Sequence, residues 1–310
     1  MAQEERVASH DERPRITAVV VTYNSADLLP DFFGAMRSLE DWFDLEIVVS
    51  DNASVDGSID VARELFPEVT IVASDENRGY SAGINAGVRA ARPSDAILVL
   101  NDDIRLEPEA LSRLYAALGD PATGIAVPKL VDGSGQLLKS LRREPSVSRV
   151  LGEAVLGGER AGLYSPLGEV IEDEGAYSES SDVTWASGCA WLISRSCWDD
   201  TGEWDESFFL YAEDTEYALR ARDFGHVMRF VPDAVAVHLV GPSHRDPRLW
   251  TMSVWNRYRL YKRRHGPVQS GMFRFGLLLN ESLRAAAGRP VHRAAAEAIL
   301  NPRKLPEEVR

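Results

Sequence analysis

The chain of 310 residues lacks several features that would point to other classes of protein. It has two cysteines, Cys189 and Cys197, which are too few for a disulfide framework. No run reaches the roughly 20 apolar residues of a membrane span, and the nearest, residues 271–283, is interrupted by charged and amide side chains. The first 15 residues have no apolar core of the kind a signal peptide needs. We therefore expect a cytoplasmic protein, with any membrane contact peripheral.

Positive charge is also scarce. There are 34 Lys and Arg against 48 Asp and Glu, a net charge of -14, so we expect no nucleic-acid partner. Hydrophobic residues make up 45% of the chain, which excludes a disordered or fibrous protein. The charge is uneven, because residues 242–310 carry 14 Lys and Arg but only 5 Asp and Glu, a net of +9 that leaves -23 for residues 1–241. An acidic body thus carries a basic C-terminal tail.

Short apolar runs alternate with helical patterns over the first hundred residues. The runs cover residues 16–22, 45–50, 69–73 and 96–100, and the helical patterns lie at 28–39, 58–65 and 81–91. Such runs suit strands buried on both faces, and the alternation predicts an α/β fold with a parallel, doubly wound sheet. Ligands of such sheets bind at the carboxyl ends of the strands.

The regular alternation ends near residue 129. Residues 139–181 are rich in Gly, Ser and Glu with weak periodicity, and we interpret them as a long loop of the kind that forms lids or binding loops. Further short strands are predicted at 183–185, 190–194, 227–231 and 234–238, with a helix at 213–224. The chain from residue 249 has the pattern of amphipathic helices.

Polar side chains or glycine follow each of the first four predicted strands. They are Thr22, Tyr23 and Asn24, then Asp51, then Arg78 and Gly79, and finally Asn101, Asp102 and Asp103. An alternative is that Asn24, Asp51 and Asn101 make Asx turns or cap the following helices, and that the carboxylate pair caps a helix near Pro108. Capping, however, requires neither an arginine nor adjacent carboxylates.

Glycines at 79, 83 and 87 share one face of a predicted helix, where each interior glycine costs about 1 kcal/mol relative to alanine. Close packing of the helix explains Gly87, whereas a phosphate or sugar near the amino end better explains Gly79.

Two acidic pairs carry the candidate chemistry. Asp102 and Asp103 offer the oxygen ligands that Mg²⁺ or Mn²⁺ prefers when it bridges to a diphosphate. Glu213 and Asp214 follow the aromatic run at 208–211, and an aspartate desolvated in this way suits a general base, although acids are also common at helix starts. His238 ends a predicted strand and either completes a metal site or has a structural role.

At this point the residues resemble the inverting family 2 glycosyltransferases. The motifs are VVTYN at 20–24, DNASVDGS at 51–58, NRG at 77–79, LNDD at 100–103, WASG at 185–188, EWDESFF at 203–209 and YAED at 211–214. They follow the family's order, and within the family they are most similar to the bacterial rhamnosyltransferase-like subgroup. One departure is Asn101, where the family's DXD motif usually opens with Asp.

The resemblance implies a GT-A fold, a mostly parallel Rossmann-like sheet flanked by helices, with a helical C-terminal tail. It implies a nucleotide-sugar-binding half at 15–130 and an acceptor-binding half at 131–245. Composition and periodicity predict a flexible tail at 1–14 and a basic helical tail at 246–310. The implied donor-binding residues are Thr22, Tyr23, Asn24, Asp51, Arg78, Gly79, Asn101 and Asp102. The sugar and acceptor region holds Trp185, Ser187, Gly188 and Glu213, the divalent metal binds Asp103 and His238, and Asp214 is the catalytic base.

The implied reaction moves a sugar, with rhamnose from dTDP-rhamnose as the best guess, to an acceptor hydroxyl by a single inverting displacement. The acceptor is a glycan, a lipid-linked saccharide or a small molecule. The alternative is a catalytically silent nucleotide-sugar-binding or scaffold protein. A dinucleotide oxidoreductase is excluded because the turn after the first strand, TYNSAD, contains no glycine.

The basic tail allows two interpretations. Trp250, Val254, Tyr258 and Tyr261 form a helical stripe, and five basic residues cluster at 257–264. Either the stripe packs on the catalytic core, or it forms an interfacial helix that binds an anionic membrane.

Overall fold

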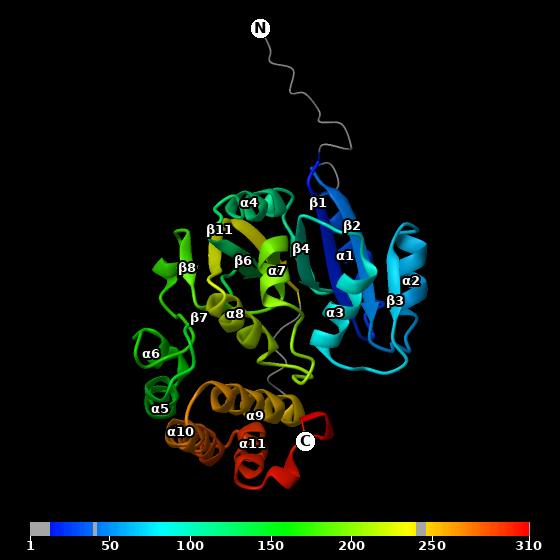
Figure 1. Cartoon of the computed structure of the whole chain (residues 1–310). Coiled ribbons are helices and arrows are strands. Elements are labelled where there is room, and N and C mark those ends of the chain that lie inside the picture. The colour runs from blue at the N-terminus through cyan, green and yellow to red at the C-terminus, as the bar shows by residue number, and fades with distance from the viewer. Residues whose placement is uncertain (1–12, 40–41, 240–245, 310) are drawn as a thin grey trace.

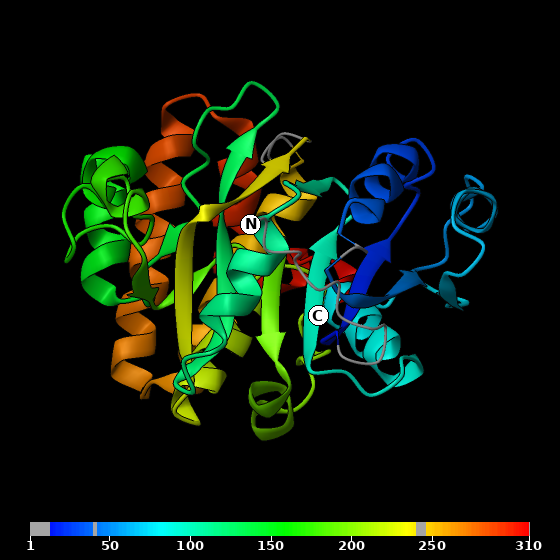
Figure 2. The ribbon, with the colours of Figure 1, turned by 90° about the horizontal axis from the view of Figure 1, so that it is seen from above.

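The computed structural model describes residues 13–39, 42–239 and 246–309, so the predicted tail at 1–14 lies almost entirely outside the described residues. A mixed sheet forms the centre of the molecule, with strand order β3-β2-β1-β4-β10-β6-β11-β5 and with β8 paired to β11. Figure 2 shows this order from the cyan β3 to the yellow β11. The strands are β1 (Arg15–Thr22), β2 (Asp44–Asp51), β3 (Thr70–Ala73), β4 (Ala96–Asn101), β5 (Ile104–Leu106), β6 (Thr123–Asp132), β8 (Ser181–Val183), β10 (Ala190–Ser194) and β11 (Val227–His238).

The predicted α/β fold is confirmed. Strands β1 to β4 pair in parallel, as do β6 and β11, whereas β10 runs antiparallel between β4 and β6. The two strands predicted at 227–231 and 234–238 are one strand, β11, whose register against β6 shifts between Val231 and Val235. A bulge of this kind bends a strand without ending it. A separate two-stranded sheet pairs β7 (Leu141–Arg142) with β9 (Trp185–Ala186).

Helices cover both faces of the sheet because alternate strand residues point to opposite sides. Leu98 and Leu100 of β4 belong to the core that contacts α1 (Leu29–Arg37), α2 (Ser58–Leu65) and α4 (Ala110–Ala117). Ile97 and Val99 belong to the core beneath α3 (Tyr80–Ala90), α7 (Arg195–Thr201) and α8 (Glu213–Asp223). The strands are therefore apolar on both faces, as the continuous runs in the sequence predicted.

The glycines of α3 bring that helix against the sheet. A Cβ on Gly83 would lie 2.6 Å from a methyl carbon of Val21, and one on Gly87 would lie 2.5 Å from a methyl carbon of Val19. Close packing of α3 on β1 therefore explains both glycines.

The long loop predicted at 139–181 is wrong in part, because it contains α5 (Val147–Leu156), α6 (Gly158–Gly162) and a 3-10 turn at Glu174–Tyr177. Helix α5 packs along α10 (Pro267–Ala286), and a Cβ on Gly276 would lie 2.5 Å from a methyl carbon of Val150. The partner of α5 is thus more than a hundred residues away, and local periodicity gives little sign of it.

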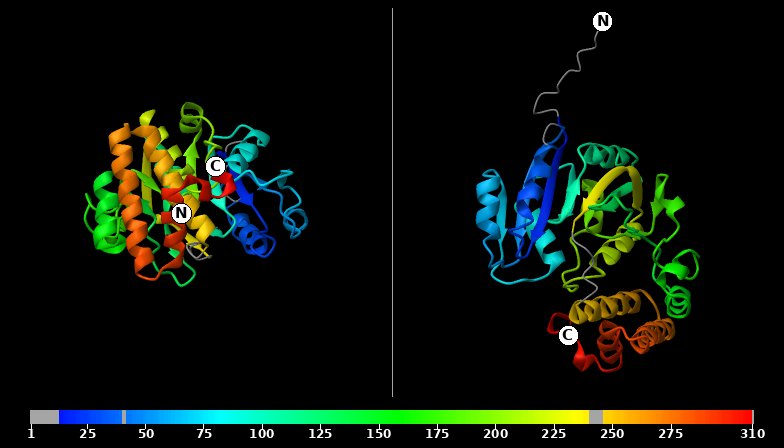
Figure 3. Two further views of the ribbon diagram at one scale, coloured as in Figure 1. Left: turned by 90° about the horizontal axis from the view of Figure 1, so that it is seen from below. Right: turned by 180° about the vertical axis from the view of Figure 1, so that it is seen from behind.

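The C-terminal helices form a layer against one end of the α/β body (Figures 1 and 3). They are α9 (Pro247–Arg264), α10 and α11 (Pro290–Leu300), followed by 3-10 turns at Pro302–Lys304 and Glu307–Val309. Each of the three helices has proline in its first turn, where the missing N–H removes no helical hydrogen bond. The predicted helical C-terminal tail is confirmed. No helix in these described stretches has the length and hydropathy needed to cross a membrane.

The stripe on α9 packs inward. Val254 and Tyr261 are buried in a cluster with Phe273, and Trp250 and Tyr258 pack against that cluster. Three of the basic residues form ion pairs, Arg257 with Glu153 and Glu169, Arg263 with Asp205, and Arg264 with Asp223. The structure therefore favours the core-packing interpretation of this segment.

Replacing Arg257 with methionine should lower the free energy of unfolding by about 3–5 kcal/mol. Arg257 Nη2 lies 3.0 Å from Glu153 and 2.5 Å from Glu169, both of them buried, so the variant leaves two carboxylates without their counter-ion. Urea unfolding monitored by circular dichroism measures the change. Lys262→Met, at an exposed position of the same helix, is the matched control. An unchanged midpoint for Arg257→Met would show that the ion pairs contribute little.

Candidate active site

The carboxyl ends of the parallel strands face the C-terminal helices, and the predicted site residues gather at this edge (Figure 1). The loops after β1 and β2 are joined by their polar side chains. Thr22 Oγ1 donates to Asp51 Oδ1 at 2.9 Å, and Asp51 Oδ2 accepts from the Ser54 N–H at 2.8 Å. Asn24 has φ 56° and accepts from the Val55 N–H, while Tyr23 is exposed. Thus Asn24 and Asp51 do order the turns, and in doing so they shape the edge of the sheet.

Arg78 and Gly79 lie between this edge and the loop before α8. Arg78 Nη2 is 2.8 Å from Glu206 Oε2, and its side chain is 56% exposed. Gly79 has φ 89°, and a Cβ there would lie 2.1 Å from the carbonyl oxygen of Phe209. The Tyr80 N–H donates to that same oxygen at 2.9 Å. Backbone packing therefore accounts for Gly79 without a phosphate.

The carboxylates after β4 do not cap a helix, since α4 begins after Glu109 without a side-chain cap. Asn101 hydrogen-bonds through its backbone N–H to the Cys189 carbonyl at 2.9 Å. Asp102 is partly buried, and burial raises its pKa, although a hydrogen bond from Ser25 opposes the shift. Asp103 Oδ2 lies 2.9 Å from His238 Nε2. The structure thus brings together the two residues predicted as metal ligands.

A divalent cation fits this pair. Asp103 Oδ1 is buried and has no hydrogen-bond partner, which leaves a carboxylate oxygen available beside the imidazole. Among the described residues no cluster of three or more His, Cys, Asp or Glu could bind a metal by itself. Mg²⁺ and ions like it commonly take only one or two protein side chains and complete their coordination with substrate phosphates and water. Two side chains are therefore sufficient when a diphosphate supplies the remaining oxygens.

Asp214 lies in the first turn of α8 and is held by three donors. Its Oδ1 accepts from the Thr215 N–H at 2.6 Å and from Thr215 Oγ1 at 3.2 Å, and its Oδ2 accepts from the Gly188 N–H at 3.2 Å. Burial raises the pKa of Asp214, and these hydrogen bonds oppose the increase. Tyr211 and Ala212, which lie three and two residues before Asp214, both have positive φ, so the backbone is strained just before the turn that carries this carboxylate.

Glu213 and Trp185 line the space beside Asp214. Burial, and then the charge of Asp214, raises the pKa of Glu213 to about 8, so Glu213 is largely neutral at pH 7. Its Oε2 has no hydrogen-bond partner. Trp185 is held by a hydrogen bond from its ring nitrogen to the Arg143 carbonyl at 3.0 Å. The backbone carbonyl of Ser187 accepts a hydrogen bond from the Trp191 ring nitrogen at 3.0 Å. Glu213 and Trp185 therefore line the pocket next to Asp214.

The loop before β10 contacts both acidic pairs. The Gly188 N–H donates to Asp214 Oδ2 at 3.2 Å, and the adjacent Cys189 carbonyl accepts from the Asn101 N–H at 2.9 Å, directly before Asp102 and Asp103. Burial, and after it the charge of Asp103, raises the pKa of the Cys189 thiol to about 12, and the charge of Asp214 adds to this effect. The partly buried Tyr80 side chain is similarly influenced. Burial raises its pKa, and the charges of Cys189, Glu213, Asp102 and Asp103 reinforce the increase. One site thus contains both acidic pairs that the sequence singled out.

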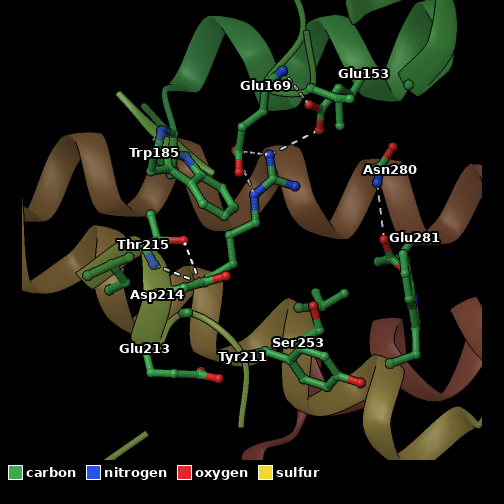
Figure 4. A pocket seen from close by; sticks show the side chains of 18 of the residues that line it. Glu153, Glu169, Trp185, Tyr211, Glu213, Asp214, Thr215, Ser253, Asn280 and Glu281 are labelled. Atoms are coloured by element: carbon green, nitrogen blue, oxygen red, sulfur yellow. Dashed lines mark hydrogen bonds and ion pairs between the residues drawn. The ribbon is translucent and has the colours of Figure 1, made fainter. Parts of the chain in front are cut away.

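A pocket of about 340 Å³ opens beside Asp214 (Figure 4). Its walls also include residues that the sequence reasoning missed or interpreted differently, namely Glu153, Glu169, Ser253, Asn280 and Glu281. They come from α5, the segment before β8, α9 and α10, so no single motif contains them. Trp250 and Arg257 line the pocket as well, although the sequence suggested only core packing or a membrane face for their helix.

Comparisons with known proteins agree with this geometry. Residues 17–197 match the family model described as glycosyl transferase family 2. The chain is 29% identical over 244 residues to an N-acetylglucosaminyl-diphospho-decaprenol L-rhamnosyltransferase of Mycobacterium tuberculosis, covering 75% of this chain and 78% of that protein. It is 24% identical over 266 residues to the dTDP-rhamnosyl transferase RfbF of Shigella flexneri, covering 82% of each.

A mannosyltransferase from Pyrobaculum calidifontis, solved with GDP-Man and Mn²⁺, has the same fold, with a TM-score of 0.57 at 20% identity over 96% of this chain and 78% of that one. The family match covers more than half of the residues, and the predicted motifs lie at one edge of the predicted sheet. The chain therefore belongs to glycosyl transferase family 2, and its residues resemble those of the family's rhamnosyltransferases.

Proposed function

We propose that this glycosyltransferase moves a sugar from a nucleoside-diphosphate donor to an acceptor hydroxyl, with inversion in a single displacement. The observation that carries the proposal is that one loop, at Gly188 and Cys189, contacts both Asp214 and the end of β4, where Asp103 pairs with His238. A base and a diphosphate-binding centre are the two parts that such a displacement needs.

The donor that we propose is dTDP-rhamnose. Two relatives named for rhamnosyl transfer, one of them for dTDP-rhamnose, support this choice. The nucleotide would bind in the N-terminal half, at 15–130, along Thr22, Tyr23, Asn24, Asp51, Asn101 and Asp102. Gly79 would lie beside it at the amino end of α3, and Arg78 would exchange its ion pair with Glu206 for the diphosphate.

Asp214 would take the proton of the acceptor hydroxyl as that oxygen attacks the anomeric carbon. Its hydrogen bonds from Thr215 and Gly188 fix the carboxylate in one orientation, and burial makes it a stronger base than an exposed aspartate. A divalent cation, Mg²⁺ or Mn²⁺, held by Asp103 and His238 would neutralise charge on the departing diphosphate. Solved relatives that contain Mn²⁺ support this requirement.

The acceptor would enter from the second half of the domain, at 131–245, and from the tail at 246–310. A glycan, a lipid-linked saccharide and a small molecule each offer a hydroxyl, and the name of the mycobacterial relative, a diphospho-decaprenol rhamnosyltransferase, supports a lipid-linked one. A cytoplasmic location would accompany that choice, and any peripheral contact with an anionic membrane would use surfaces other than the packed stripe of α9.

Addition of dTDP-rhamnose with Mg²⁺ or Mn²⁺ should raise the melting temperature more than UDP- or GDP-sugars do. A ligand at 100 times its dissociation constant stabilises a protein by about 2.7 kcal/mol. Nucleotide release in the same samples separates an enzyme from the silent binding protein, because only the enzyme turns the donor over. Equal shifts for all nucleotides would contradict the choice of donor, and binding without release, with or without acceptors, would favour the silent alternative.

A further inference from the structure

The pocket beside Asp214 has features that select the chemistry of its ligand (Figure 4). Its volume, about 340 Å³, is at the small end of the range for ligand pockets, roughly 300–1,000 Å³. The wall away from the sheet comes from α9 and α10, which lie beyond the residues that match the family model. What enters this pocket is therefore chosen partly by side chains outside the segment that matches the family model.

Negative charge dominates the pocket. Five carboxyl groups line it, those of Glu153, Glu169, Glu213, Asp214 and Glu281, of which Glu213 is largely neutral at pH 7. Two guanidinium groups oppose them, and Arg257 is already bound to Glu153 and Glu169. The other, Arg284, donates to the backbone carbonyls of Asn280 and Glu153 at 3.3 Å. A phosphate or carboxylate would meet surplus negative charge here, whereas hydroxyl groups can donate to these oxygens.

Two polar side chains of the pocket have oxygen atoms that form no hydrogen bond within the protein. Asn280 is 6% exposed and Glu213 is 5% exposed, yet Asn280 Oδ1 and Glu213 Oε2 have no hydrogen-bond partner. A buried polar atom without a partner costs free energy, and a ligand hydroxyl would relieve that cost. Both residues line the pocket, on walls that belong to different parts of the chain.

Aromatic side chains provide flat apolar surfaces beside these polar groups. Trp185, Tyr211 and Trp250 all line the pocket. The position of Trp250 is fixed because its ring nitrogen donates to Glu281 Oε2 at 2.7 Å and its ring packs edge-on against His292. Rigid aromatic surfaces next to hydrogen-bonding groups suit a ring that has one apolar face and several hydroxyls.

We propose that this pocket binds the terminal ring of the acceptor as an uncharged saccharide, and that Trp250 and Ser253 of α9 set its specificity. The inference rests on the proposed function and adds to it the class of acceptor. The hydroxyl to be glycosylated would face Asp214, and any phosphate of a lipid-linked acceptor would lie outside the pocket. Anionic rings such as uronic acids would be rejected.

Saturation-transfer NMR with p-nitrophenyl glycosides tests the proposal. The neutral probes are the glucoside, galactoside, mannoside, rhamnoside and N-acetylglucosaminide, and the anionic probes are the glucuronide and galacturonide. We expect at least one neutral glycoside to bind, and Ser253→Trp to weaken that binding by about tenfold or more because it fills the pocket. Lys262→Trp, which adds the same ring at an exposed position of α9, should leave binding unchanged.

Titration of dTDP with Mn²⁺ into the same proteins gives an independent reading. Nucleotide binding should be equal in wild type and Ser253→Trp, and Ser253→Met replaces the tryptophan variant if the latter does not fold. The acceptor proposal is overturned if the nucleotide binds but no neutral glycoside does, if the anionic probes bind better, or if the pocket variant binds glycosides normally. Failure of every nucleoside diphosphate to bind would instead refute the proposed function.

Discussion

Replacement of Asp214 by asparagine is expected to lower the rate of sugar transfer by about 10²- to 10⁴-fold, the usual contribution of a positioned acid or base. The amide keeps the shape of the side chain and can still accept from Thr215 through its oxygen, so the fold and the bound nucleotide should persist. What is lost is the ability to take the proton of the acceptor. Initial rates of transfer, measured together with nucleotide affinity by calorimetry, separate these two effects. Transfer within threefold of wild type would mean that another group is the base.

Glu213→Gln is the matched control, because it makes the same chemical change at the adjacent residue. Glu213, with its pKa raised to about 8, is largely protonated at pH 7, and glutamine resembles that neutral form. Transfer at pH 7 should therefore stay close to wild type. A loss as large as that of Asp214→Asn would assign the proton transfer to Glu213 instead.

The dependence on pH follows from the same pair. A base works when deprotonated, so kcat/KM should rise with pH through the Asp214 pKa, which burial raises above the ordinary value of about 3.9. Above about pH 8, ionisation of Glu213 adds a second negative charge beside Asp214, and the rate should fall. Glu213→Gln should remove this alkaline limb and keep the acid limb.

Asp103→Ala should abolish the part of nucleotide affinity that depends on a divalent cation. EDTA should abolish sugar transfer by the wild-type enzyme. Asp103 Oδ1 is a buried oxygen without a partner, and Oδ2 contacts His238, so the substitution removes both the available ligand atom and the group that orients the imidazole. Calorimetric titration of dTDP with and without Mn²⁺ measures the difference directly.

Glu107→Ala removes an exposed carboxylate four residues further along and should leave the cation dependence unchanged. His238→Gln should weaken the dependence without altering Asp103. Full activity of wild type in EDTA, or a normal response of Asp103→Ala to Mn²⁺, would refute the metal centre.

Much of the fold is encoded locally. The runs at 16–22 and 96–100 became β1 and β4, and the helix expected at 58–65 is α2 with the same limits. These elements could be predicted because strands buried on both faces are apolar throughout, and because surface helices carry apolar residues at a period of 3.6. The prediction of a loop at 139–181 was wrong in part because α5 is buried against α10, a contact that local periodicity does not reveal.

Part of the candidate site could likewise be predicted from local sequence. Thr22, Asp51, Asp103, Asp214 and His238 could be found from the sequence, because each directly follows or ends a strand, or starts a helix, within a recognisable motif. The order of the strands then brings these positions to one edge, as the parallel arrangement requires.

By itself, the sequence determined the α/β class, the family and the acidic pairs, since these depend on short-range patterns of residue type. Only the tertiary structure decided the role of the basic tail. The charges of Arg257, Arg263 and Arg264 are bound by carboxylates from distant segments. It also decided the composition of the pocket, where Glu153, Ser253 and Asn280 meet although the first lies a hundred or more residues before the others. Such convergence depends on how helices pack, which composition and periodicity do not specify.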